Sequence, residues 1–238
     1  MSNDKKFILF VEGASDIKFF ESYINYLGQS VPINLKNFKF QSIGGSDDKS
    51  ITNALRSNLG DINSNPISTI GIILDLDDLT KAARQKQIND ALINVFSNEK
   101  LSAGENEFHL NVEYSENKNI KVVSHFIDEF DNVNNLEELL MTLVMTNPIA
   151  AKCLSSWKDC CDKNDRKITA SEFSKFWREV YVRFDYCSDQ NLKKHAVDNC
   201  TVEKSYLNML VPEKPKAWNF DSEYLSPVKT FLTKFIIN

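Results

Sequence analysis

Apolar residues follow two alternating spacings through the first 145 residues. Continuous apolar runs, typical of strands covered on both faces, occur at 7–11, 38–43, 67–74 and 120–127. After each run, apolar residues recur every three or four positions, which predicts helices at about 16–27, 47–59, 80–96 and 135–145. Strands that alternate with helices predict an α/β fold of Rossmann-like type, with a four-stranded parallel sheet flanked by helices.

The pattern changes after Pro148, where helical spacing dominates to the end of the chain. We therefore expect an α/β domain over 1–146 and an α-helical C-terminal lobe over 147–238. A further edge strand is expected near 108–112, where apolar and polar residues alternate. One apolar stripe of the lobe is interpreted first as core, with a low prior for stacking on nucleic acid: Phe173, Phe176, Trp177, Val180 and Phe184.

Charge is distributed unevenly along the chain. The net charge is −5, but 105–149 carries −7 and 150–238 carries +3. This pattern fits a carboxylate cluster beside a polyanion-binding lobe, although solvated helix faces explain most of the charges. The five cysteines have no zinc-site spacing, and no secretory signal or membrane-length apolar run is seen. We therefore expect free thiols in a cytoplasmic protein without membrane contact.

Acidic residues stand where the predicted strands end. Glu12 follows the first strand, Asp75 and Asp77 follow the third, and Asp131 and Glu137 follow the fourth. Carboxyl ends of parallel strands share one edge of the sheet, so these side chains are expected to converge. Their mutual repulsion would be relieved by a divalent cation, and oxygen ligands without histidine favour Mg²⁺ or Mn²⁺ over zinc.

The alternation of side chains between the two faces of the third strand gives a further prediction. If the strand stays extended, Asp75 and Asp77 share one face and Leu76 points inward. The competing interpretation of an Asp-x-Asp pair is a solvated surface turn.

These motifs resemble those of Toprim domains. The apolar strand that ends in Glu12-Gly13, followed by Asp16, resembles the first Toprim motif, and residues 72–77 resemble the second. The fuller resemblance is to the OLD-like nuclease branch and its small stand-alone relatives. It includes the Gly44-Gly45 turn and the Leu-Glu-Glu-Leu segment at 136–139, and it covers roughly residues 6 to 145.

The resemblance implies divalent-metal-dependent hydrolysis of phosphodiester bonds in DNA or RNA. It implies catalytic roles for Glu12, Asp75 and Asp77, with one or two Mg²⁺ or Mn²⁺ ions held by these three together with Asp16 and Glu137. Gly44, Gly45 and Lys49 are the expected phosphate contacts. A partner ATPase, as in defence systems of the OLD-like kind, is also implied. Asn135 departs from the glycine of the small relatives, and Lys49, Lys81 and Arg84 are unranked candidates for a cation at the leaving phosphate.

Four alternatives stay open from the sequence. The domain could be a non-catalytic binding or adaptor module. It could also be a phosphatase that uses the Asp-x-Asp motif, although that motif calls for Thr or Val where Leu79 stands and leaves Glu12 without a role. Finally, Gly44-Gly45 could be a plain tight turn, and Glu137 could serve the dipole of its helix.

Overall fold

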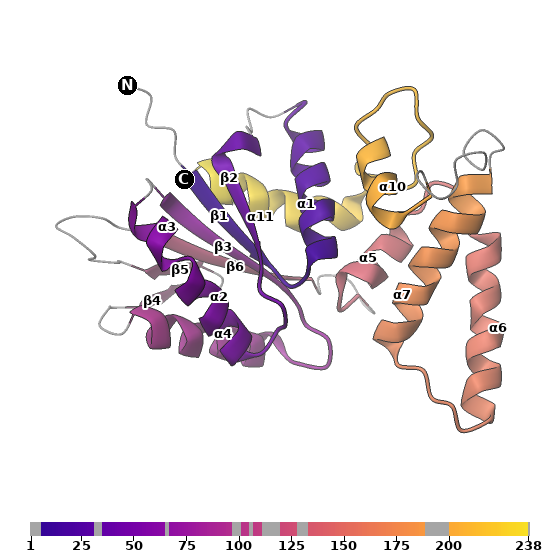
Figure 1. Ribbon diagram of the computed structural model, residues 1–238, viewed down its shortest axis with the longest axis horizontal. Coiled ribbons are helices and arrows are strands. Elements are labelled where there is room, and N and C mark those ends of the chain that lie inside the picture. The colour runs from indigo at the N-terminus through magenta and orange to yellow at the C-terminus, as the bar shows by residue number, and fades with distance from the viewer. Residues whose placement is uncertain are drawn as a thin grey trace. The chain divides into compact units, whose positions relative to one another are not determined.

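The computed structural model describes residues 6–30, 35–64, 67–96, 101–104, 107–110, 120–127, 133–188 and 200–237 (Figure 1). The chain separates into two compact units. The first comprises 1–129 together with 227–238, and the second comprises 130–226. The domain boundary expected between 146 and 147 falls inside the second unit, and the C-terminal helix belongs to the first.

The first unit is built on a sheet in which six strands are described, in the order β2-β1-β3-β6-β5-β4. The strands are β1 (Lys6–Val11), β2 (Phe38–Ser42), β3 (Ile67–Asp75), β4 (Leu101–Gly104), β5 (Glu107–Leu110) and β6 (Ile120–Ile127). The pairs among β2, β1, β3 and β6 are parallel, which confirms the predicted four-stranded parallel sheet. The strand expected near 108–112 is β5, but it is not at the edge, because β4 pairs with it in an antiparallel hairpin.

Helices cover both faces of this sheet (Figure 1). On one face lie α2 (Asp48–Ser57), α3 (Leu59–Ser64) and α4 (Lys81–Phe96), and on the other lie α1 (Ala14–Leu27) and α11 (Ser226–Ile237). A short 3₁₀ turn, η1 (Leu35–Asn37), precedes β2. Ile8, Ile72 and Leu92 represent the buried core under α2 and α4. The alternation of helices between the two faces makes this a doubly wound α/β unit.

Gly71 marks the place where α11 packs on the sheet. A Cβ at this position would lie 2.7 Å from Cδ1 of Leu9 and 3.0 Å from Cε2 of Phe235. The Phe235 ring also lies 5.2 Å from that of Phe7 and 6.0 Å from that of Phe38, measured between centroids. The glycine inside β3 is therefore explained by the close approach of a helix more than 150 residues away in the sequence.

The second unit is helical, as predicted for the C-terminal region. Its elements are α5 (Leu136–Thr142), α6 (Ile149–Lys163), α7 (Ala170–Val180), the π-helical η2 (Tyr181–Asp185), the 3₁₀ turn η3 (Tyr186–Ser188), α10 (Val202–Asn208) and η4 (Glu223–Leu225). The Tyr181 hydroxyl links distant segments, because it donates to the carbonyl of Ala217 at 2.7 Å and accepts from the amide of Met145 at 3.2 Å. None of the helices described in either unit has the length and apolarity needed to cross a membrane.

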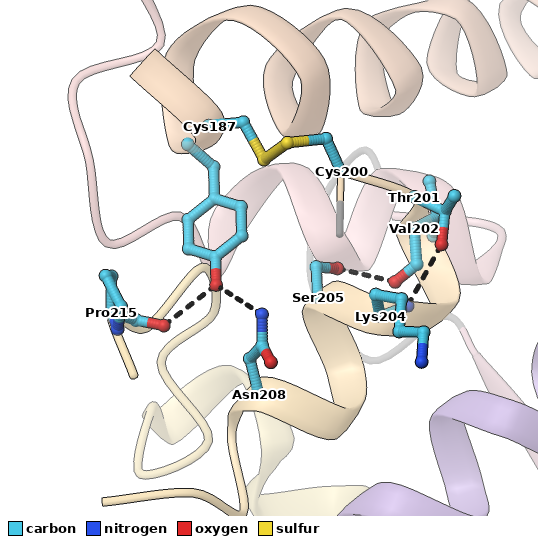
Figure 2. The surroundings of a disulfide bond; sticks show 9 residues. Cys187, Cys200, Thr201, Val202, Lys204, Ser205, Asn208 and Pro215 are labelled. Carbon is cyan, nitrogen blue, oxygen red and sulfur yellow. Dashed lines mark hydrogen bonds between the residues drawn. A yellow bond between two sulfur atoms is a disulfide. The ribbon is translucent and has the colours of Figure 1, made fainter. Parts of the chain in front are cut away.

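A disulfide bond joins Cys187, in η3, to Cys200, which precedes α10 (Figure 2). Beside it, the hydroxyl of Tyr186 donates to the carbonyl of Pro215 at 2.9 Å and accepts from Nδ2 of Asn208 at 3.0 Å. The expectation of free thiols is therefore wrong for this pair, whose Cα atoms lie 6.0 Å apart, a normal separation for a disulfide. Cysteine spacing could not predict the bond, because it depends on how the second unit folds. The other three cysteines are free thiols.

Candidate functional site

The candidate site lies where the helical connections between strands change from one face of the sheet to the other. The helix α1 connects β1 to β2 on one face, and α2 lies between β2 and β3 on the other face (Figure 1). In doubly wound sheets, ligands bind outside the carboxyl ends of strands at such a switch point, here between β1 and β3. Glu12 follows β1, and Asp75 is the last residue of β3. The register pairs Val11 with Ile73, so Glu12 lies one residue short of Asp75 along the neighbouring strand.

The Gly44-Gly45 turn is fastened to the backbone of Glu12. The carbonyl oxygen of Glu12 accepts hydrogen bonds from the Gly44 amide at 2.9 Å and from Oγ of Ser42 at 3.2 Å. Gly44 has φ 78° and Gly45 has φ 153°, backbone conformations that favour glycine. A Cβ on Gly44 would meet nothing within 4 Å, so conformation rather than space requires this glycine. The predicted glycine turn is thus held next to Glu12.

This turn leads into α2, which carries the predicted phosphate contact Lys49. Asp47 caps the helix by accepting from the Ser50 amide at 2.8 Å and from Oγ of Ser50 at 3.0 Å. These two hydrogen bonds lower the pKa of the Asp47 carboxyl, so the cap is ionised at neutral pH. Lys49 is exposed in the first turn of the helix. Its position is compatible with a phosphate contact and equally with a solvated surface lysine.

Arg84 ties together three segments at this edge of the sheet. Its side chain is buried, although it belongs to the surface helix α4. Nε donates to the carbonyl of Asp75 at 2.9 Å, and Nη1 donates to the carbonyl of Ser46 at 2.6 Å. Nη1 also donates to Oε1 of Gln87 at 3.1 Å, and Nη2 donates to Oδ2 of Asp77 at 3.0 Å. The guanidinium therefore holds the end of β3, the glycine turn and the turn before α4.

From the sequence, Arg84 is only one of three unranked candidates for a cation at the leaving phosphate, and its burial gives it a different role. The signal that could have identified it is its phase in α4. Arg84 stands four residues before Ile88 and eight before Leu92, on the apolar side of the helix. An arginine on the buried side of a helix must form its hydrogen bonds with other groups of the protein.

Asp77 does not continue the strand that ends at Asp75. It has φ 50°, in the left-handed region, so the extended alternation assumed from the sequence stops before it. Leu76 is buried, as predicted. The Asp77 carboxylate forms an ion pair with Arg84 instead of lying beside Asp75 on one strand face. Binding a metal through Asp77 would have to compete with this ion pair.

Asp16 has a structural role at the start of α1. Its Oδ2 accepts a hydrogen bond from the Gly13 amide at 2.9 Å, which satisfies a backbone donor at the N-terminus of this helix. An acidic residue at this position also stabilises the helix through its dipole. The Glu-x-x-x-Asp spacing is therefore explained in part by helix capping.

Glu137 lies in the second unit, in the first turn of α5. Its Oε1 lies 2.9 Å from Nη1 of Arg178, and about nine-tenths of both side chains is buried. Asn135 caps α5 by accepting from the Glu138 amide, with an extended φ of −153°. The Asn at this position therefore causes no backbone strain. Asp131 lies outside the described residues.

The described part of the chain contains no group of three or more His, Cys, Asp or Glu side chains arranged to hold a metal ion. Glu12 and Asp75 are the predicted ligands to consider together, because they stand at the carboxyl ends of the neighbouring strands β1 and β3. Mg²⁺ is commonly bound by one or two carboxylates, with water and substrate phosphate oxygens completing its shell. The Glu12–Asp75 pair therefore suits an ion that binds together with a phosphate substrate. It suits less well an ion held entirely by protein ligands.

Of three comparisons with known proteins, one finds a match, and it concerns the family of the chain. A family model described as "Protein of unknown function (DUF3226)" matches residues 6–237, nearly the whole chain. No curated protein and no solved structure matches. The family match extends over both compact units, so the helical unit is part of what defines the family.

Proposed function

The chain belongs to the DUF3226 family of proteins of unknown function, and from its site we propose that it hydrolyses phosphodiester bonds in DNA or RNA with Mg²⁺ or Mn²⁺. The observation that carries the proposal is the position of Glu12 and Asp75 at the carboxyl ends of β1 and β3, on the switch point of the sheet. Glu12 and Asp75 are also among the residues on which the resemblance to Toprim domains rests. The cytoplasm is the proposed compartment, and a partner ATPase is proposed from the same resemblance.

Each residue at this edge has a proposed part. Glu12 and Asp75 would hold the ion, which when bound neutralises phosphate charge and lowers the pKa of a water molecule. In the alternative role that the resemblance implies, the Glu12 carboxylate would act as general base and accept a proton from the attacking water. Arg84 keeps Asp75 and the Gly44-Gly45 turn in place through its hydrogen bonds to the Asp75 and Ser46 carbonyls. Backbone amides of that turn and the exposed Lys49 would bind substrate phosphate.

A specific observation favours a second candidate, a non-catalytic binding module. The carboxylates of Asp16, Asp77 and Glu137 are engaged by a backbone amide, Arg84 and Arg178 respectively. A domain whose acidic residues make structural contacts would keep the fold but would not bind a catalytic metal ion. The phosphatase alternative gains no such support, because Asp77 is held by Arg84 in a left-handed turn.

Titration calorimetry with Mn²⁺ separates the two candidates. The hydrolase predicts binding in the micromolar to millimolar range that the double substitution Glu12→Gln and Asp75→Asn removes. The matched control is Glu21→Gln, which changes a carboxylate of α1 that pairs with Lys18 on the surface. Absence of binding at millimolar Mn²⁺, with and without an oligonucleotide, would favour the binding module.

A further inference from the structure

The guanidinium of Arg84 has most of its donors occupied by groups of the protein. It forms four hydrogen bonds, to the carbonyls of Asp75 and Ser46, to Oε1 of Gln87 and to Oδ2 of Asp77. A guanidinium has five N–H donors, so these four bonds leave little of it for a substrate. The side chain of Arg84 is 4% exposed and that of Asp77 is 39% exposed. Arg84 is therefore a buried support, and Asp77 covers it on the solvent side.

The backbone of the turn after β3 places the Asp77 carboxylate on Arg84. Asp77 has φ 50°, a left-handed conformation that Asp tolerates better than most residues. The turn is closed by the Leu79 amide, which donates to the carbonyl of Leu76 at 2.9 Å, and the side chain of Leu76 is buried. The carboxylate then accepts from Nη2 of Arg84 at 3.0 Å. Transfer of this carboxylate to a metal ion would break the ion pair with Arg84.

The two carbonyls that Arg84 holds belong to the two parts of the proposed site. The carbonyl of Asp75 ends β3, and Ser46 directly follows the Gly44-Gly45 turn. The other end of this turn is fastened to β1 through the hydrogen bond from the Gly44 amide to the carbonyl that follows the strand. The orientation of one guanidinium therefore determines where the turn lies relative to the strand ends proposed to hold the ion.

We propose that Asp77 is a positioning residue and not a metal ligand, so that the site binds its ion through Glu12 and Asp75 without it. This inference rests on the proposed function, and it departs from the metal-binding role that the resemblance to Toprim domains implies for Asp77. A charge-assisted hydrogen bond to one edge of the planar guanidinium fixes the directions of its other donors. Asp77 thereby acts, through Arg84, on the turn that is proposed to bind phosphate.

Two substitutions of Asp77 separate a positioning residue from a metal ligand. Asp77→Asn keeps an oxygen that accepts a hydrogen bond from Arg84, but it removes the negative charge that a hard cation prefers. Asp77→Gly removes the acceptor as well, and both residues tolerate the left-handed backbone. A positioning role predicts that only Asp77→Gly is impaired, whereas a metal ligand predicts that both variants are. Asp78→Asn removes an exposed carboxylate of the same turn and is the matched control.

Hydrogen–deuterium exchange of the full chain in EDTA tests the positioning role without any activity. Peptides that cover the Gly44-Gly45 turn report on it, because the Gly44 amide is protected by a hydrogen bond. We expect Asp77→Gly and Arg84→Lys to speed exchange in these peptides by about tenfold, since each weakens a charge-assisted hydrogen bond. Asp77→Asn and Asp78→Asn should exchange like wild type. Exchange that Asp77→Gly leaves unchanged, or that Asp77→Asn speeds equally, overturns the proposal.

Titration calorimetry with Mn²⁺ tests whether Asp77 is a ligand. The dissociation constant of Asp77→Asn should lie within about threefold of the wild-type value, and Asp75→Asn should raise it by about tenfold or more. An Asp77→Asn variant that loses as much affinity as Asp75→Asn overturns the proposal. A wild type that binds no Mn²⁺ would refute the proposed hydrolysis, and the exchange experiment would still decide whether Asp77 positions the turn.

Cleavage kinetics on an oligonucleotide distinguish phosphate binding from the chemical step. Asp77→Gly should raise KM by roughly tenfold and leave kcat within about threefold, because the turn binds substrate and does not touch the reacting atoms. Asp77→Asn should restore the wild-type KM. A fall in kcat at unchanged KM in both variants would place Asp77 at the reacting atoms and overturn the proposal.

Discussion

The buried guanidinium of Arg84 donates to Oδ2 of Asp77 at 3.0 Å, and the same side chain holds the carbonyl that ends β3. A residue of α4 thereby determines the conformation of the proposed site without contributing a carboxylate to it. Asp77, which the sequence places in the acidic cluster, is bound to this arginine. The first prediction follows from this relationship.

Arg84→Ala should lower the free energy of unfolding by about 2–4 kcal/mol, because it removes a buried side chain and leaves the carbonyls of Asp75 and Ser46 without their donor. Arg84→Lys should recover only part of the loss, since an ammonium cannot reproduce the planar fork. Urea unfolding measures both effects. The control is Arg56→Ala, which removes an exposed arginine that also donates to a backbone carbonyl, that of Asn94 at 3.2 Å, and should change stability by less than about 0.5 kcal/mol. Equal effects at the two positions would contradict the assigned role of Arg84.

The Glu137–Arg178 pair should behave as a buried ion pair. Glu137→Leu and Arg178→Met should each cost about 3–5 kcal/mol, because each removes the ion-pair partner of a buried opposite charge. The double variant should cost clearly less than the sum, which a double-mutant cycle from urea unfolding measures. Lys158→Ala, which breaks a surface pair with Asp162, should cost at most about 1 kcal/mol and serves as the control. Additive effects in the cycle would show that the two side chains do not depend on each other.

The Cys187–Cys200 bond predicts the number of reactive thiols. Alkylation of unreduced, denatured protein should label the three free cysteines, and all five cysteines should react after reduction. Reduction should also lower the stability of the second unit by about 3 kcal/mol, given the short loop that the bond closes. The variant with Ala at both positions should not respond to reductant. Labelling of five thiols before reduction would contradict the bond.

Stability should depend on pH through His125. Burial, and to a lesser extent the charge of Lys81, lowers the pKa of His125 from 6.5 to about 4. The unfolded chain then binds a proton more readily than the folded chain, so stability is lost as pH falls from about 6.5 towards 4. Between pH 7.5 and 4.5 the wild type should lose about 2–3 kcal/mol more than His125→Leu in its free energy of unfolding. Parallel pH profiles of the two proteins would mean that His125 is not buried in its neutral form.

The sequence predicted the elements whose signals are local. Apolar runs such as 7–11 and 67–74 identify strands that are covered on both faces of the sheet. The alternation of these strands with helices predicts that they pair in parallel. The pairing of β4 with β5 was missed, because so short a strand carries little pattern. The position of α11 was missed as well, since the contact between Phe235 and Gly71 joins distant parts of the chain.

The candidate site likewise has a part that the sequence predicted and a part that it could not predict. Strand order places Glu12 and Asp75 at neighbouring strand ends, and this much followed from motif positions. The partners of Asp77 and Glu137 could not be predicted. The first depends on a left-handed turn after β3, and the second depends on an arginine 41 residues away that becomes buried only when α5 and α7 pack.

Cleavage of labelled DNA and RNA in Mn²⁺ tests the central claim most directly. The proposed hydrolysis predicts that wild type cleaves one of them, that EDTA abolishes cleavage, and that Glu12→Gln or Asp75→Asn lowers the rate by about 100-fold or more. Glu21→Gln should retain the wild-type rate, and equal melting temperatures would show that all variants are folded. Cleavage by Glu12→Gln and Asp75→Asn at the wild-type rate would contradict the assignment of the site to the ends of β1 and β3.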